Sequence, residues 1–178
     1  DYQNKIEQLK LDVVDPEFTN VQIGTEVDAF DNLLHLYKPL VYVGKGYKGK
    51  LQVSPIPLDA SEKQFLVDLI VYVGSKPTSL EGKEVHVLRN QSKKGLGFFT
   101  DGNNFYPDFI VWIVEENKQR IIFVDPKGIR NSKGLNDPKI QFYKVLKEKI
   151  QPQVEKAGIE LDSFIISNTK HMEVQWAK

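Results

Sequence analysis

The stretch FYPDFIVWIVEENKQRIIFVDPKGIR, residues 105–130, decides the fold of this chain. It holds two runs of apolar strand-forming residues, 106–114 and 120–126, with a short polar turn between them, which predicts a β-hairpin. Asp108 stands at the start of the first run and Asp125 at the end of the second. Because hairpin pairing sets the start of one strand opposite the end of the other, we expect these two carboxylates to lie close together.

The end of the second run carries a second charged side chain. Asp125 and Lys127 are two residues apart and project from the same face of a strand, whereas Pro126 removes a ladder hydrogen bond and predicts that the pairing breaks there. Two nearby carboxylates repel each other unless a cation lies between them, and magnesium prefers oxygen ligands of this kind. Read singly, Asp108 is a turn or strand-cap aspartate and Lys127 a salt-bridge partner of Asp125. Their joint arrangement favours a site.

The rest of the chain adds two helices and two strands. Residues 59–74 place apolar side chains at helical spacing and end at Gly74, KEVHVLRN at 83–90 alternates as a strand does, and the polar stretch 91–104 predicts a loop. Asp137 followed by Pro138 predicts the start of a second helix that runs to Gly158, and residues 161–167 predict a buried final strand. The order α-β-β-β-α-β indicates an α/β fold with a mixed sheet flanked by helices.

Glu62 and several basic residues have two interpretations each. The spacing of Asp59 and Glu62 matches a capping box, but Glu62 also lies on the apolar stripe of its helix and so could face the sheet. Basic residues in or beside the loop, and after the second strand of the hairpin, are candidate contacts to nucleic-acid phosphates or simply solvated side chains. These residues are Arg89, Lys93, Lys94, Arg130 and Lys133.

Composition excludes several classes of site. The 178 residues include no cysteine and only three histidines, so thiolate chemistry is excluded and any metal is expected to be a hard cation held by oxygens. Net charge is zero, yet residues 1–31 carry −6, so the remaining 147 residues carry +6, which is compatible with DNA binding. No apolar run reaches the length of a membrane span, so we expect a soluble, cytoplasmic domain that makes no membrane contact.

The motifs together resemble a nuclease superfamily. YPDF at 106–109 and DPK at 125–127, with Glu62 on a preceding helix, resemble the PD-(D/E)XK nucleases. More narrowly, LRNQSKKGLGFF…NFYPDFIVWI…IIFVDPKG is similar to the C-terminal endonuclease domain of type III restriction enzyme Res-subunit-like, DEAD/DEAH-box helicase proteins of bacteria. The resemblance spans roughly residues 58–167 and implies a restriction-endonuclease-like core.

The resemblance implies metal-dependent hydrolysis of DNA phosphodiester bonds that leaves 5′-phosphate and 3′-hydroxyl ends. Asp108, Asp125 and Glu62 would bind Mg²⁺, with Mn²⁺ as a substitute, and the backbone carbonyl of Pro126 would be a further ligand. Lys127 would orient the attacking water, help to deprotonate it and stabilise the developing charge. Glutamine and tyrosine at the spacing of some exonuclease relatives are not cleanly present, so an endonuclease is the implied activity.

The predicted organisation is an N-terminal extension, residues 1–57, that packs on or extends a nuclease core, residues 58–178. No phosphate-binding GxxxxGK[ST] loop is present, so we expect a helicase or ATPase module elsewhere in the same native chain, and this segment to be cut from that longer protein. Cutting both DNA strands would require a second site, a dimer or repeated nicking. The alternative is a catalytically inactive nuclease-fold domain that binds nucleic acid or scaffolds the helicase.

Overall fold

The fold was analysed in a computed structural model that divides into two compact units, Asp1–Gly74 and Ser75–Lys178. The contacts therefore group the helix that carries Glu62 with the N-terminal residues, whereas the sequence suggested a boundary after residue 57. Each unit is described by itself below. The structure describes residues 21–22, 27–30, 34–35, 40–47, 57–100, 103–126 and 134–167.

The N-terminal unit contains short strands and one long helix. Its elements are β1 (Val21–Gln22), β2 (Val27–Phe30), β3 (Leu34–His35), β4 (Leu40–Val43), the 3₁₀ turn η1 (Lys45–Tyr47) and α2 (Ala60–Gly74). Strands β1, β2 and β4 form an antiparallel sheet in that order. The amide of Leu58 donates to the carbonyl of Val41 at 2.8 Å and ties β4 to the residues just before α2.

Helix α2 has the extent that its apolar spacing predicts. Leu66 on the predicted stripe has no exposed surface, whereas Val71 and Tyr72 between the stripe positions are 66% and 49% exposed. The helix ends at Gly74 as expected, but Gly74 does not take the left-handed conformation of a glycine cap. That conformation occurs two residues later, at Lys76, with φ +48°.

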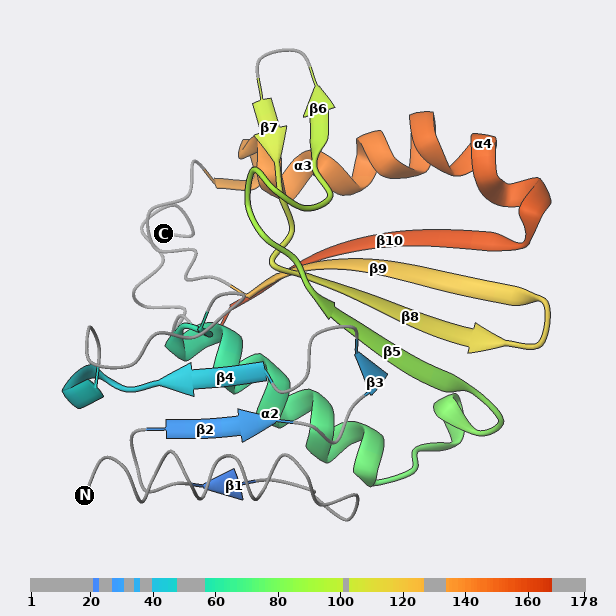
Figure 1. The fold of residues 1–178 in the computed structure, drawn as a ribbon. Helices are drawn as coiled ribbons and strands as arrows, with labels where there is room; N and C mark the ends of the chain where they lie inside the picture. The colour runs from blue at the N-terminus through green and yellow to red at the C-terminus, as the bar shows by residue number, and fades with distance from the viewer. Residues whose placement is uncertain are drawn as a thin grey trace. The chain divides into compact units, whose positions relative to one another are not determined.

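Four strands of the C-terminal unit form a mixed sheet in the order β10-β9-β8-β5 (Figure 1). Strands β9 and β10 are parallel, and the other two neighbouring pairs are antiparallel. Strands β8 and β9 form the predicted hairpin, with Glu115 opposite Lys118 at its turn. The bounds are β5 (Glu84–Arg89), β8 (Phe109–Glu115), β9 (Lys118–Pro126) and β10 (Ile159–Ile166), with a 3₁₀ turn η2 (Thr78–Leu80) before β5. This architecture confirms the α/β class.

The connection from β9 to β10 is helical and runs along one face of this sheet (Figure 1). It comprises η3 (Gly134–Asn136), α3 (Pro138–Val145), the π-helical turn η4 (Leu146–Ile150), α4 (Gln151–Val154) and η5 (Glu155–Ala157). The Asp137 side chain accepts a hydrogen bond from the Lys139 amide at 3.0 Å, as predicted for a capping residue before proline. Pro152 lacks the N–H that would bond to the carbonyl of Glu148, which explains the wider turn at this point. Gly158 closes the connection with φ +73°.

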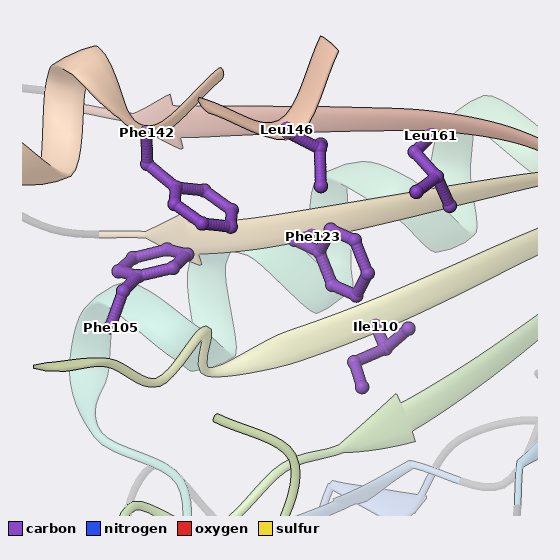
Figure 2. Close-up of a cluster of buried hydrophobic side chains, with 6 residues drawn as sticks. All are labelled: Phe105, Ile110, Phe123, Phe142, Leu146 and Leu161. Atoms are coloured by element: carbon purple, nitrogen blue, oxygen red, sulfur yellow. The ribbon is translucent and has the colours of Figure 1, made fainter. Parts of the chain in front are cut away.

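The core of the C-terminal unit lies between the sheet and these helices. Six apolar side chains drawn in Figure 2 point toward one another there, and each is at most 5% exposed. They come from the hairpin strands, from α3 and its π-helical turn, from β10, and from a short strand before β8. The six are Phe105, Ile110, Phe123, Phe142, Leu146 and Leu161.

The predicted loop 91–104 is partly wrong, because its second half forms a small hairpin. Strands β6 (Phe98–Thr100) and β7 (Asn103–Phe105) pair antiparallel. The ring of Phe98 lies 4.6 Å from that of Phe142 and 4.8 Å from that of Phe123, centroid to centroid. Burial of aromatic side chains against α3 therefore gives this glycine-rich segment a strand conformation that its composition does not favour.

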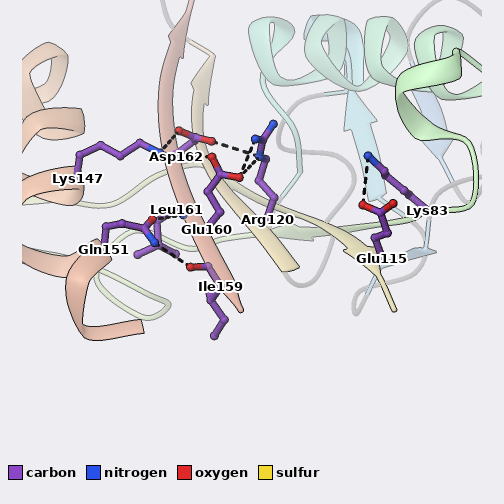
Figure 3. Close-up of polar contacts among 9 residues, drawn as sticks. All are labelled: Lys83, Glu115, Arg120, Lys147, Gln151, Ile159, Glu160, Leu161 and Asp162. Carbon is purple, nitrogen blue, oxygen red and sulfur yellow. Dashed lines mark hydrogen bonds and ion pairs between the residues drawn. The ribbon is translucent and has the colours of Figure 1, made fainter. Parts of the chain in front are cut away.

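Strand β10 ends the sheet order, and its burial is one-sided. Leu161 is 5% exposed, but Phe164 and Ile166, two and four residues from Asp162, are 52% and 44% exposed, so the prediction of a buried final strand holds for one face only. The side chain of Gln151 fastens α4 to β10: it donates to the carbonyl of Ile159 at 2.9 Å and accepts from the amide of Leu161 at 2.7 Å (Figure 3).

An ion-pair network lies on β9 and β10, on the face of β10 that carries Phe164 and Ile166 (Figure 3). Arg120 lies 2.7 Å from Glu160 and 3.6 Å from Asp162, and Lys147 reaches Asp162 at 2.7 Å. The hydrogen bond that Arg120 donates to the Glu160 carboxylate raises the pKa of Arg120 above its usual value. The side chains are about half exposed, apart from Asp162 at 19%, so this network contributes modestly to stability. Among the helices that the structure describes, none has both the length and the hydropathy needed to cross a membrane.

Candidate functional site

Asp108 and Asp125 stand at the end of the ladder between β8 and β9. Phe109 and Val124 are the last pair, so Asp108 stands one position before the pair and Asp125 one position after it, opposite each other in the continued register. Side-chain alternation places both positions on the face of Ile110 and Phe123, which is the face that α3 covers. The expectation that the hairpin brings the two acids to one place therefore agrees with the register.

The row of residues across these strand ends extends in both directions. The amide of Asn90 donates to the carbonyl of Asp108 at 2.8 Å, which sets Asn90 beside Asp108, and Ile165 is the partner of Asp125 in β10. Asn90, Asp108, Asp125 and Ile165 thus stand side by side on four neighbouring strands or their extensions. The sheet presents its two acids between a buried amide and an aliphatic side chain.

Asp125 has no exposed surface, and a lysine stands next to it. The Nζ atom of Lys139 lies 3.6 Å from Oδ2 of Asp125, and the lysine side chain is 47% exposed. Lys139 is in the first turn of α3, which begins at Pro138. The capped start of the helix therefore places this ammonium group at the end of β9. Sequence reasoning missed Lys139, because its nearness to Asp125 depends on how α3 docks on the sheet.

The main chain at Asp108 is held from β5. Its carbonyl accepts hydrogen bonds from the Asn90 amide at 2.8 Å and from Nη1 of Arg89 at 3.2 Å, and the same Nη1 donates to the carbonyl of Asn90. Arg89 is 8% exposed, and its guanidinium lies 5.5 Å from the ring centroid of Phe109. The sequence suggests a phosphate contact or a solvated side chain for Arg89, whereas its contacts here give it a structural role.

The structure describes Pro126 but not the three basic residues that were predicted after it. Pro126 is the last residue of β9 and pairs with Ile166 of β10, so the predicted break in pairing occurs on the β8 side only, where the ladder stops at Val124. Lys127, Arg130 and Lys133 lie outside the residues that the structure describes. Lys93 and Lys94 are exposed in the loop after β5, in a turn closed by the amide of Gly95, which donates to the carbonyl of Gln91 at 2.7 Å.

Glu62 belongs to the N-terminal unit, and there it completes a capping box. Its carboxylate accepts from the amide of Asp59 at 2.8 Å, and its own amide donates to Oδ1 of Asp59 at 2.8 Å. This reciprocal pair satisfies two amides at the start of α2. These two hydrogen bonds confirm the capping interpretation of Glu62, which is 4% exposed.

The donor set at the strand ends suits a hard cation. Within the part of the chain that the structure describes, no group of three or more histidine, aspartate or glutamate side chains gathers at ion-binding distance. Magnesium, however, often takes only one or two carboxylates and completes its shell with water and substrate phosphate. The ammonium group of Lys139 beside the buried Asp125 shows that this position already accommodates a positive charge.

Comparisons of the chain with models of protein families, with curated proteins and with solved structures gave no match.

Proposed function

We propose that the C-terminal unit is the nuclease part of a Mg²⁺-dependent DNA endonuclease of the PD-(D/E)XK type. The observation that carries this proposal is the position of Asp108 and Asp125, opposite each other just beyond the last pair of the β8–β9 ladder and on one face of the sheet. The resemblance of YPDF and DPK to nuclease motifs supports the same reading. A carboxylate with no exposed surface is costly to bury unless a cation lies beside it, and Lys139 shows that this strand end accommodates one.

Each residue has a defined role in this proposal. Asp108 and Asp125 hold the magnesium ion, together with the backbone carbonyl of Pro126. The ion, when bound, polarises the phosphoryl oxygens and lowers the pKa of a bound water. Lys127, two residues after Asp125 in the sequence, orients the water and stabilises the charge that develops on the phosphate. The resemblance adds Glu62 as a further acid.

Contacts to DNA fall to basic residues around the strand ends. Lys93 and Lys94 are exposed in the loop that follows β5, and Lys127 is followed in sequence by Arg130 and Lys133. Lysine and arginine contacts to phosphates position the duplex without reading its sequence. Translocation and delivery of the DNA fall to a helicase module of a restriction or defence-type protein.

A second function is favoured by the contact between Lys139 and Asp125. In a nuclease fold that binds nucleic acid without cutting it, a lysine could neutralise the buried carboxylate permanently, and no metal would be needed. Such a domain would bind DNA or scaffold the helicase. A metal titration separates such a domain from the enzyme, because only the enzyme binds an ion at Asp125.

The test is cleavage of supercoiled plasmid by the protein with Mg²⁺ or Mn²⁺, against EDTA and against Asp125→Asn. We expect nicking that requires the metal and is lost in the variant. The matched control is Asp162→Asn, which removes a carboxylate from the same sheet at its Arg120 and Lys147 contacts and is expected to leave cleavage unchanged. Metal-dependent cleavage that survives Asp125→Asn would contradict the site, and DNA binding without metal binding or cleavage would favour the second function.

A further inference from the structure

Asn90 is a buried polar residue whose side chain joins two separate segments. It is 2% exposed, and its Nδ2 donates to the carbonyl of Leu96 and to the carbonyl of Pro107, both at 2.8 Å. Its Oδ1 accepts from the amide of Leu96 at 2.9 Å. One amide side chain therefore closes the loop that follows β5 and attaches that loop to the residue before Asp108.

The orientation of this amide follows from its partners. Two carbonyl oxygens require a group with two hydrogens to donate, and the Leu96 amide requires an acceptor, so Nδ2 and Oδ1 can take only these places. A serine, an aspartate or an alanine at this position would leave at least one of the three groups without its partner. Among the common side chains of this size, asparagine alone satisfies the set.

The loop is built around this side chain. A Cβ atom added to Gly95 would lie 2.0 Å from Oδ1 of Asn90, so the glycine lets the main chain pass directly against the amide. The closed loop carries Lys93 and Lys94 on its exposed side. The Asn90 side chain also attaches the loop to Pro107, which is covalently bonded to Asp108. The carbonyl of Asp108 in turn accepts a hydrogen bond from the backbone amide of Asn90.

We propose that Asn90 is a positioning residue that couples the basic loop to the metal-binding acid Asp108. This proposal rests on the proposed nuclease function. Asn90 touches neither metal nor DNA; it fixes the main chain on both sides of the site, so that the lysines hold a phosphate where Asp108 holds its ion. Partners that orient a metal ligand typically change metal affinity by roughly 10- to 100-fold when they are removed.

The proposal predicts a signature that a merely structural residue would not give. Asp108→Asn should weaken metal binding and leave DNA binding without metal nearly unchanged, and Lys93→Ala with Lys94→Ala should do the reverse. Asn90→Ala should weaken both, metal binding by roughly 10-fold. In the Asp108→Asn background, Asn90→Ala should have no further effect on metal affinity, because the two changes act on the same ligand.

The experiment measures Mg²⁺ affinity by calorimetry without DNA, and affinity for a labelled duplex by fluorescence anisotropy in EDTA. Wild type, Asn90→Ala, Asp108→Asn and the double variant are compared, with Asn104→Ala, an exposed asparagine of the β6–β7 hairpin, as the control that should match wild type. Gly95→Ala serves as a second route to the same displacement, because it keeps the amide and presses on it, should Asn90→Ala fail to fold.

The outcomes separate the two proposals. Folded Asn90→Ala or Gly95→Ala protein with wild-type affinities for both Mg²⁺ and DNA would overturn the positioning role and leave the nuclease proposal intact. Additive effects of Asn90→Ala and Asp108→Asn on metal affinity would also overturn it. A wild-type protein that binds no metal and cuts no DNA would overturn the nuclease proposal, and the positioning role with it.

Discussion

The Nζ atom of Lys139 lies 3.6 Å from Oδ2 of Asp125, a carboxylate with no exposed surface. The lysine side chain is 47% exposed, so its ammonium group is the link between this buried charge and solvent. Without an ion, Lys139 compensates the charge of Asp125; with one, two cations face the same carboxylate. The stability of the protein and its affinity for metal are therefore coupled through this contact.

Lys139→Ala tests that coupling. Removing the ammonium group leaves Asp125 less compensated, so we expect the free energy of unfolding in EDTA to fall by roughly 1–2 kcal/mol, between the values for exposed and buried pairs. Saturating Mg²⁺ should restore most of this loss, because the ion replaces the missing cation. Thermal unfolding with and without Mg²⁺ measures both effects.

The control for this prediction is Lys144→Ala on the same helix. Lys144 lies over the ring of Tyr143, and its removal should change stability little and equally with and without the metal. Equal stabilisation of wild type, Lys139→Ala and Lys144→Ala by Mg²⁺ would show that the ion does not bind at Asp125.

Asp108→Asn and Lys127→Ala test the chemistry directly. We expect each to abolish cleavage and to leave the fold intact, because the asparagine is isosteric and the lysine follows the last residue of β9. Loss of one such group typically lowers the rate of a metal-dependent hydrolysis by a factor of about 100 or more. Plasmid nicking, with circular dichroism to check folding, measures this; unchanged activity in either variant would remove that residue from the site.

Glu62 is tested by a pair of substitutions that separate capping from chemistry. Glu62→Ala removes the hydrogen bond to the Asp59 amide and should lower the free energy of unfolding by about 0.5–2 kcal/mol. Glu62→Gln keeps an acceptor for that amide and should stay close to wild type in stability. If Glu62 also acts as an acid of the nuclease, Glu62→Gln loses cleavage while its melting temperature is retained; full activity would limit Glu62 to helix capping.

Gly95→Ala is expected to destabilise the C-terminal unit. The new methyl group would overlap Oδ1 of Asn90, and overpacking of this kind costs roughly 1–3 kcal/mol. Gly74→Ala is the matched control, since a Cβ there meets nothing within 4 Å and the residue ends a helix, where alanine is at least as favourable as glycine. Chemical denaturation of both variants measures the difference, and similar stabilities would show that the loop yields at little cost.

Local patterns predicted the hairpin and both helix starts. Alternating apolar residues indicated strands β8 and β9, and the pairing of Glu115 with Lys118 then sets every later pair up to Phe109 and Val124. The capping residue Asp137 and the capping box at Glu62 are encoded by spacings of three residues or fewer. These features were predictable because each depends only on neighbours in the chain.

The small hairpin at Phe98 was not predictable in this way, and its reason is tertiary. The segment is rich in glycine and polar residues, and only contact with Phe142 and Phe123 makes a strand favourable for it. The π-helical turn at Leu146–Ile150 was missed for a different reason, because apolar spacing reports which face of a helix is buried and not how its hydrogen bonds are arranged.

By itself, the sequence determined the α/β class, the hairpin and the opposed positions of Asp108 and Asp125 in the strand register. Strand register follows from alternation and turn position. Only the tertiary structure decided which other residues lie beside these two acids. Lys139 reaches Asp125 because α3 docks over the end of β9. Asn90 donates a hydrogen bond to the carbonyl of Pro107 because the loop after β5 folds back upon the Asn90 side chain. Such contacts depend on the packing of elements that are far apart in the chain, and no local pattern of residues encodes them.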